Sequence, residues 1–255
     1  MPRRSRNPLS KVQDLLPVYH VSPTGGDTAR VGIHPHRARA NPHISRGEGQ
    51  GRGFYAWTSP EAARAFAKEN VLGGIEGLFG EARKKAKGYR IYKAMVPRSQ
   101  ILPDAEVSFP AIQRTLLENI ERVQAAINAA NARIPKGGIR TSQFKERTGS
   151  KRKSWPWRIA GVSKTRDDYD NETVGVNWHS VDDSGNKIVS KFSDSPFTAL
   201  DATTGSAQLL GPILKAIKAH DPALMNELID QTVKSKRGAV RSRVGSKLEL
   251  VEELL

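Results

Sequence analysis

Two side chains in the first quarter of the chain have types and surroundings suited to ligand chemistry. They are His20, in the segment PVYHVS, and Tyr55, in the segment GRGFYAW. An imidazole can donate or accept a hydrogen bond, and a tyrosine ring offers a flat face on which another ring can stack. Either residue alone is typical of a structural position on a strand. Their order, with a polar loop between them and a helix start soon after Tyr55, indicates that they serve one site.

The loop between these two segments, residues 23–52, is rich in Gly, Pro, Arg and His. Guanidinium groups suit bidentate contacts with phosphate, and glycines let the backbone approach a ligand closely. The residues concerned are Arg30, Arg37, Arg39, Arg46 and Arg52, with Gly47, Gly49, Gly51 and Gly53. The three histidines of the loop have no carboxylate or Cys at a recognisable metal spacing, so we predict no metal site; they are His34, His36 and His43.

Short strands and a helix must position His20 and Tyr55. Residues 17–22 and 53–58 carry the β-branched and aromatic side chains that favour strands. Ser59 is a good N-cap and Pro60 suits the first helical position, which predicts a helix over residues 60–70. We also predict a helix over 74–87 and a strand over 88–97 that stops at Pro97.

The clearest pattern in the chain is an apolar stripe with steps of three and four residues. It predicts one amphipathic helix over residues 110–134 that packs on a sheet, opened by Pro110 and closed by Pro135. The stripe consists of Ile112, Leu116, Ile120, Val123, Ile127, Ala130 and Ile134.

The second half of the chain divides by charge. Residues 133–166 carry eleven Lys or Arg against one Glu, whereas residues 167–201 carry eight Asp or Glu against two Lys. Within the acidic part, ETVGVNWHS and NKIVSKF predict two strands joined by the turn VDDSGN. Two helices follow, near 206–219 and 222–236.

This order of elements predicts an α+β fold, with one small mixed or antiparallel sheet and helices packed around it. We expect residues 1–16 to form a basic flexible tail and residues 17–200 the main domain. Within that domain, residues 133–166 form a basic insert. Residues 201–255 are expected to form a helical C-terminal region.

The blocks around His20 and Tyr55 resemble the ADP-ribosyltransferase superfamily in its His-Tyr-acid branch, which includes PARP-like and diphtheria-toxin-like enzymes. Members of this branch look like YH on a first strand, then GxGFY, a small or polar pair and an xxAxxxA helix. The corresponding blocks here are Tyr19-His20, Gly51 to Tyr55, Thr58-Ser59 and Ala62-Ala63 to Ala67. The resemblance covers about residues 17–100 and implies that residues 17–200 form an ADP-ribosyltransferase-like domain.

The resemblance implies an enzyme that uses NAD as co-substrate. Such an enzyme would release nicotinamide and transfer ADP-ribose to a protein or nucleic-acid acceptor. His20 would hold the adenosine-side ribose hydroxyls and a nearby backbone carbonyl, and Tyr55 would stack on the nicotinamide. The loop 23–52 would fold over the pyrophosphate, and Arg52, Gly53 and Ser59 are the other residues expected at the cofactor.

The third member of such a site is a Glu, sometimes an Asp or Gln, on a later strand. It bonds the 2'-hydroxyl of the nicotinamide ribose and stabilises the positive charge that develops on the sugar. Glu172 in NETVGV is the first choice, because Asn-Glu followed by alternating apolar residues resembles the family's usual Glu strand. Glu106 in DAEVSF is the alternative, and Gln208 in TTGSAQLL is the third.

Charge and composition bear on the partner. The chain of 255 residues has a formal net charge of +15, which favours anionic partners such as nucleic acid or an acidic protein surface. The alternative function is therefore a basic nucleic-acid-binding or virion-associated structural protein without catalysis. On that interpretation residues 133–166 and 234–247 bind, and Trp155 and Trp157 stack on bases among the Lys and Arg around them.

The location follows from two absences in the sequence. The chain has no Cys and no apolar run near the ~18 residues that span a bilayer. We therefore expect no disulfide, no membrane partner and a cytoplasmic protein. That expectation includes a phage- or mobile-element-borne protein that acts in a host cytoplasm, by analogy with the family.

Overall fold

A computed structural model of the chain describes residues 14–23, 54–72, 88–134, 139, 144–148, 151–155, 157–181, 187–188, 197–201, 204–242 and 248–254. The strands are β1 (Leu15–Pro23), β2 (Phe54–Trp57), β3 (Tyr89–Pro97), β4 (Ile101–Pro103), β5 (Phe144–Thr148), β6 (Lys151–Trp155), β7 (Trp157–Arg166), β8 (Glu172–Val181), β9 (Lys187–Ile188), β10 (Phe197–Ala199), β11 (Ala239–Ser242) and β12 (Leu248–Leu254). The helices are α2 (Pro60–Phe66), continued by a π-helical segment Ala67–Leu72, then α3 (Phe109–Glu118), α4 (Ile120–Arg133), α5 (Thr204–His220) and α6 (Pro222–Lys234). A short 3-10 turn, Arg98–Gln100, joins β3 to β4.

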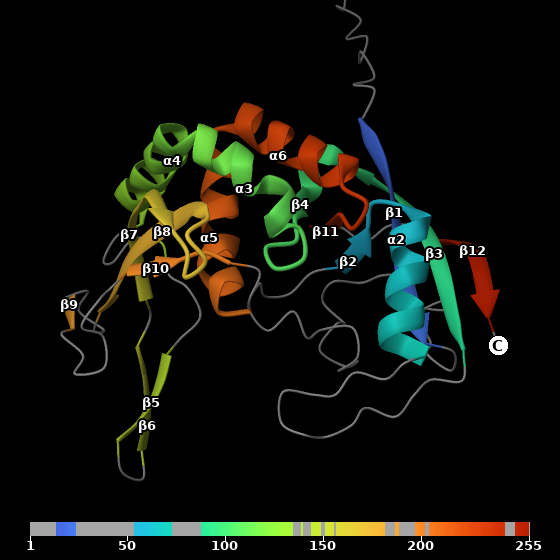
Figure 1. The fold of residues 1–255 in the computed structure, drawn as a ribbon, viewed down its shortest axis with the longest axis horizontal. Helices are drawn as coiled ribbons and strands as arrows, with labels where there is room; N and C mark the ends of the chain where they lie inside the picture. The colour runs from blue at the N-terminus through green and yellow to red at the C-terminus, as the bar shows by residue number, and fades with distance from the viewer. Residues whose placement is uncertain are drawn as a thin grey trace, which may run out of the picture.

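The strands form two main sheets, which lie in opposite halves of the molecule (Figure 1). One has six strands in the order β12-β3-β1-β2-β11-β4, and its neighbours are all antiparallel. The other contains β10, β8, β7 and β9, and β5 pairs with β6 as a separate ribbon. The predicted α+β class is therefore confirmed, but the single sheet that the sequence predicts is two sheets and a ribbon, because the strands from β5 to β10 pair among themselves.

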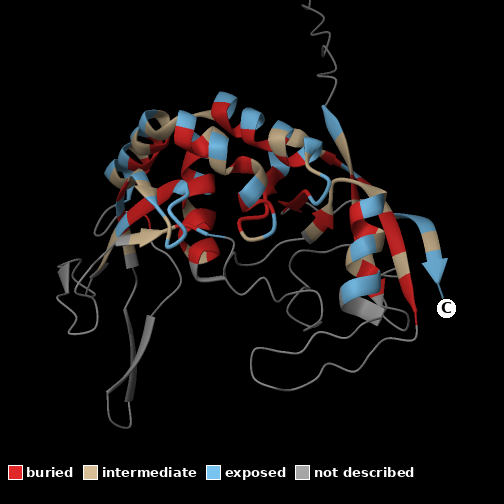
Figure 2. Cartoon of the chain, viewed as in Figure 1, coloured by how far each residue is buried: buried red, intermediate tan, exposed pale blue. Residues whose placement is uncertain are grey.

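One hydrophobic core connects the two sheets. It contains Val18 and Val240 from the six-stranded sheet, Val162 and Val176 from the other, and buried side chains of α3, α4, α5 and α6. In Figure 2 the buried residues line the inner faces of these helices, while their outer faces are exposed. A smaller cluster lies where α2 packs on β1 and β3, built around Ala63, Ala67, Tyr89 and Ile91.

The single helix predicted over 110–134 is two helices, because the chain breaks at Asn119. The backbone of Asn119 has φ −113° and ψ 29°, and its side-chain amide donates to the Thr115 carbonyl oxygen at 2.9 Å. An Asn side chain that bonds local backbone competes with helix continuation. The apolar stripe crosses the break without a change of phase, since Leu116 in α3 and Val123 in α4 are both buried in one core.

The C-terminal region is not helical throughout. The helices α5 and α6 lie where they are predicted, but β11 and β12 follow them and join the six-stranded sheet on either side of β3, β1 and β2. The acidic strand β8 pairs with β9 as predicted, and its longer partner is β7, from the basic stretch. The helix predicted over 74–87 and residues 1–13 of the predicted tail lie outside the described residues. Leu15 and Leu16, which the sequence places in the tail, belong to β1 because they pair with β3.

Candidate functional site

In the six-stranded sheet, the neighbouring strands β1 and β2 part after a short stretch of backbone pairing. β1 pairs with β3 through nine successive residues, from Leu15 to Pro23. With β2 it shares a single pair, Tyr19 opposite Trp57. Beyond that pair the two strands are bridged by a side chain, since His20 Nδ1 lies 2.9 Å from the carbonyl oxygen of Tyr55. The structure therefore brings His20 and Tyr55 together at the place where backbone pairing between their strands stops.

The contact with Tyr55 fixes the tautomer of His20. A carbonyl oxygen only accepts, so Nδ1 carries the proton and donates it, and Nε2 of the neutral ring is an acceptor. The side chain is buried, and burial lowers the pKa of His20 against the opposing effect of the bond to Tyr55. The imidazole is thus neutral at pH 7, with an acceptor nitrogen suited to a hydroxyl donor.

Tyr55 faces two charged residues that the sequence did not single out, Arg241 and Asp104. Tyr55 lies directly opposite Arg241 in the ladder between β2 and β11, so the two side chains share one face of the sheet. Burial raises the pKa of Tyr55. The charge of Arg241 and a hydrogen bond from its guanidinium group act in the opposite direction, and the charge of Asp104 raises this pKa further. Arg241 and Asp104 are both buried.

No local signal marks these two residues. Arg241 belongs to a basic stretch that reads as solvent-exposed surface, and Asp104 follows a three-residue strand. Their position depends on which strands pair, and β11 is separated from β2 by most of the chain. Only the pairing reveals them.

Of the other residues expected at the cofactor, Ser59 lies in the described part of the chain and has a structural role there. The Ser59 hydroxyl caps α2, because it accepts from the Ala62 amide at 3.1 Å. Its neighbour Thr58 is held next to the start of β11, with its amide donating to the carbonyl oxygen of Gly238, the residue before that strand, at 2.9 Å. Arg52, Gly53 and the loop arginines and histidines lie outside the described residues.

The predicted acids lie at different distances from this site. Glu172 begins β8 in the four-stranded sheet, in the opposite half of the molecule from β1 and β2 (Figure 1), so the structure does not bring it to His20 and Tyr55. Its pattern of alternating apolar residues is real, but it describes a strand of another sheet. Glu106 lies in the turn after β4, where its amide donates to Asp104 Oδ1 at 3.0 Å. Gln208 lies within α5.

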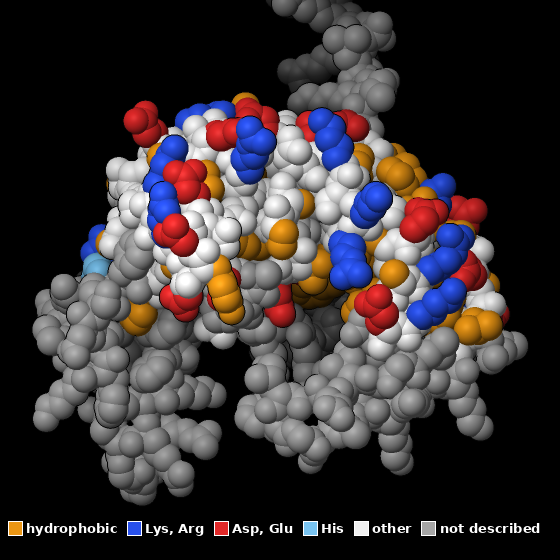
Figure 3. Space-filling model, in the orientation of Figure 1, with side chains coloured by type: hydrophobic (Ala, Val, Ile, Leu, Met, Phe, Trp, Pro, Cys, Tyr) orange, Lys and Arg blue, Asp and Glu red, His pale blue; other side chains and the backbone are white. Residues whose placement is uncertain are grey.

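The formal charge of the described residues is nearly balanced. They hold 23 Lys and Arg against 19 Asp and Glu, so most of the surplus positive charge belongs to the remaining residues. In the face shown in Figure 3, basic and acidic side chains are interspersed over the helices and the six-stranded sheet. This face of the described part is therefore not a continuous basic surface.

Comparisons with known proteins return no match: no family model, no curated protein and no solved structure resembles the chain closely enough to be reported. Among the described residues, no cluster of three or more His, Asp or Glu side chains is arranged to hold a metal ion. None of the helices in the described ranges has both the length and the apolar character needed to cross a bilayer.

Proposed function

We propose that the protein is an NAD-dependent ADP-ribosyltransferase that binds NAD where β1 and β2 part. The observation that carries this proposal is the hydrogen bond from His20 to the Tyr55 carbonyl. The family resemblance implies a histidine and a tyrosine on adjacent strands, with the histidine bonded to a nearby backbone carbonyl, and the pairing of β1 with β2 and the bond from His20 support it.

The chemistry of the two residues supports the assignment. The neutral His20 ring presents Nε2 as an acceptor, which suits a ribose hydroxyl. Tyr55 offers its ring to the nicotinamide. NAD⁺ is then cleaved at the bond between nicotinamide and ribose. Nicotinamide leaves as the neutral molecule with the bonding electron pair, and the sugar carbon forms a new bond to a nucleophile of the acceptor, which gives up its proton.

We assign the carboxylate of this reaction to Glu106 rather than Glu172. Glu106 is half-buried and lies at the β4 end of the six-stranded sheet, in the same turn as Asp104. The charge of Asp104 raises the pKa of Tyr55. Glu172 belongs to the other sheet. The acceptor is a protein or a nucleic acid, and the net charge of +15 favours an acidic one.

The test is the release of free nicotinamide from NAD by the purified protein, alone and with a cell lysate that supplies acceptors. We expect release by the wild type, loss of release in Glu106→Gln, and loss of NAD affinity in His20→Ala and Tyr55→Ala while both variants stay folded. Glu172→Gln is the matched control, with the same chemical change on the other sheet, and it should keep the wild-type rate.

Two results would overturn the assignment in different ways. Release that is abolished by Glu172→Gln and survives Glu106→Gln would return the acid to β8. No release under any condition, together with tight binding to DNA or RNA that weakens steeply with salt, would favour the nucleic-acid-binding alternative.

A further inference from the structure

Tyr55 and Arg241 lie on one face of the neighbouring strands β2 and β11, and Asp104, the residue after β4, continues that face. Tyr55 is opposite Arg241 between β2 and β11, and Val240 is opposite Pro103 between β11 and β4. The same register continued by one residue places Asp104 opposite Ala239, and the Asp104 amide does donate to the Ala239 carbonyl oxygen at 2.9 Å. Ala239 and Arg241 are two apart on one strand, so Asp104 is the diagonal neighbour of Arg241, within reach of a long side chain.

The two charges are buried next to a ring that is itself a candidate binding surface. Arg241 is 3% exposed and Asp104 is 7% exposed. A buried charge is costly unless an opposite charge compensates it, so a cation and an anion on one face stabilise each other. Both act on the hydroxyl of Tyr55, and they act in opposite directions. The net field at Tyr55 therefore depends on both residues being present.

We propose that Asp104, acting through Arg241, allows a positively charged ring to stack on Tyr55 as readily as a neutral one. The cation alone would oppose a positively charged ring, and Asp104 removes this opposition. The inference rests on the proposed function, because it takes the pyridinium ring of NAD⁺ as the group that lies on Tyr55. Asp104 is a specificity-determining residue in this scheme, and Glu106 remains the acid of the reaction.

The orientation of Asp104 makes a clean test possible. Its Oδ1 accepts from the amides of Glu106 at 3.0 Å and Val107 at 2.9 Å, which holds the turn after β4. The side-chain oxygen of an asparagine can accept the same two bonds. Asp104→Asn therefore removes the charge but keeps an oxygen that accepts the two hydrogen bonds of the turn.

The experiment compares the binding of NAD⁺ and NADH, whose dihydronicotinamide ring is neutral, by calorimetric titration. We expect Asp104→Asn to weaken NAD⁺ binding about tenfold or more and to change NADH binding by less than about threefold, since an uncompensated unit charge within several ångström is worth that much in a protein interior. The double variant Asp104→Asn with Arg241→Gln should recover NAD⁺ binding to within about threefold of wild type. Arg241→Gln alone should shift the preference the other way, toward NAD⁺, and provides the test should Asp104→Asn fail to fold.

The outcomes separate this inference from the proposed function. If the wild type binds both dinucleotides and Asp104→Asn weakens them equally, or the double variant does not recover NAD⁺ binding, the inference is wrong and the proposed function stands. If the wild type binds neither dinucleotide, the proposed function is wrong and the inference falls with it. Glu118→Gln, which removes one exposed carboxylate at the end of α3, is the control for a general effect of net charge.

Discussion

The imidazole of His20 donates a hydrogen bond to the carbonyl oxygen of Tyr55 at 2.9 Å, across the place where β1 and β2 stop pairing. Elsewhere in the sheet the join between neighbouring strands is a ladder of backbone bonds. Here a buried, titratable side chain takes over that role. The sheet therefore has a join that depends on pH, between two strands that carry the candidate site.

The first prediction concerns the pH dependence of stability. Burial lowers the pKa of His20 in the folded protein. The contribution of the neutral His20 side chain to stability is therefore fully present above the unfolded pKa of about 6.5. Below that pH the unfolded chain takes up a proton that the folded protein refuses, and the free energy of unfolding falls until the pH reaches the lowered pKa of the folded state. Urea unfolding of the wild type between pH 5 and 8 should show this fall.

The matched variant for this prediction is His20→Asn, whose side-chain amide can still donate to the Tyr55 carbonyl but does not titrate. Its free energy of unfolding should change less than that of the wild type between pH 7 and pH 5. Equal slopes for the two proteins would show that His20 is not the group responsible.

The second prediction concerns Gly238, which leads into β11 and so positions Arg241 opposite Tyr55. A Cβ at this position would lie 1.9 Å from the Thr232 carbonyl oxygen and 2.6 Å from Thr58 Oγ1. The backbone oxygen cannot move without unravelling the end of α6, so Gly238→Ala should cost about 3 kcal/mol of stability or more. It should also weaken any ligand that binds at Tyr55.

Gly161→Ala is the comparison for this effect. There the new Cβ would meet the side-chain amide of Gln124, with its Oε1 at 2.6 Å. That amide can turn away at the expense of the bond it accepts from the Val162 amide, a loss of about 1 kcal/mol. In chemical denaturation, the free energy of unfolding of Gly238→Ala should be well below that of Gly161→Ala. The reverse order would contradict this explanation.

The difference between the predicted and observed site has a physical cause. The sequence predicts β1, β2 and α2 well, because Ser59, Pro60 and the aromatic strand residues influence the conformation of only the few residues next to them. Sheet membership is set by pairing between distant segments, on which such local effects say nothing. The pattern around Glu172 predicts a strand in any sheet, and this strand belongs to the four-stranded sheet rather than to the sheet that carries His20 and Tyr55.

The same limit applies to the end of the chain, which local patterns predict to be helical. The segment LELVEEL carries apolar and acidic residues that suit a helix as well as a strand. It is a strand because β3 offers a free edge, and because its acids meet cations there: Glu252 accepts from Arg64, and Glu253 from Arg90. Tertiary pairing overrides local preference in such a segment.

The third prediction concerns this edge strand. Glu252 accepts a hydrogen bond from the Tyr89 hydroxyl at 2.9 Å as well as from Arg64, so it joins β12 to β3 and α2. The bond from Arg64 is the main cause that lowers the pKa of Glu252. Its contribution is present above the unfolded pKa of about 4.3 and is lost as the pH falls through the lowered folded value.

Hydrogen exchange of the β12 amides can check this contribution. Glu252→Gln should raise the exchange rates of β12 at pH 7 and leave those of α5 unchanged, because α5 packs mainly against α4, α6 and β4. Glu249→Gln, on the same strand, is the control, and it should have a smaller effect. Equal effects of the two variants would mean that the ties of Glu252 do not hold β12 in place.

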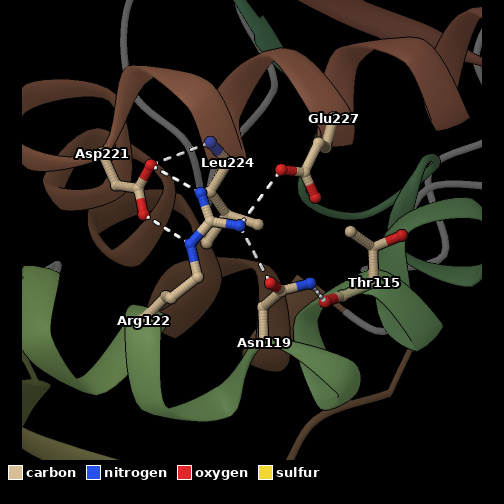
Figure 4. A network of polar contacts seen from close by, with 6 residues as sticks. All are labelled: Thr115, Asn119, Arg122, Asp221, Leu224 and Glu227. Atoms are coloured by element: carbon tan, nitrogen blue, oxygen red, sulfur yellow. Dashed lines mark hydrogen bonds and ion pairs between the residues drawn. The ribbon is translucent and has the colours of Figure 1, made fainter.

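The fourth prediction concerns the network that fastens α4 to the start of α6 (Figure 4). Arg122 binds both carboxylate oxygens of Asp221, at 2.8 and 2.9 Å, and also reaches Glu227 and Asn119. Asp221 is at the same time the N-cap of α6, since its Oδ1 accepts from the Leu224 amide at 2.9 Å. One carboxylate therefore serves a helix end and an ion pair.

The two roles of Asp221 can be separated by substitution. Asn caps helices about as well as Asp, so Asp221→Asn should keep the cap and lose the charge together with one of the two bonds from Arg122, at about 1 kcal/mol or less for a partly exposed pair. Asp221→Ala loses the cap as well and should cost about 2 kcal/mol. Arg122→Lys keeps a positive charge but not the two-pronged contact, and its free energy of unfolding should resemble that of Asp221→Asn. If Asp221→Asn were as costly as Asp221→Ala in urea unfolding, the ion pair rather than the cap would dominate this junction.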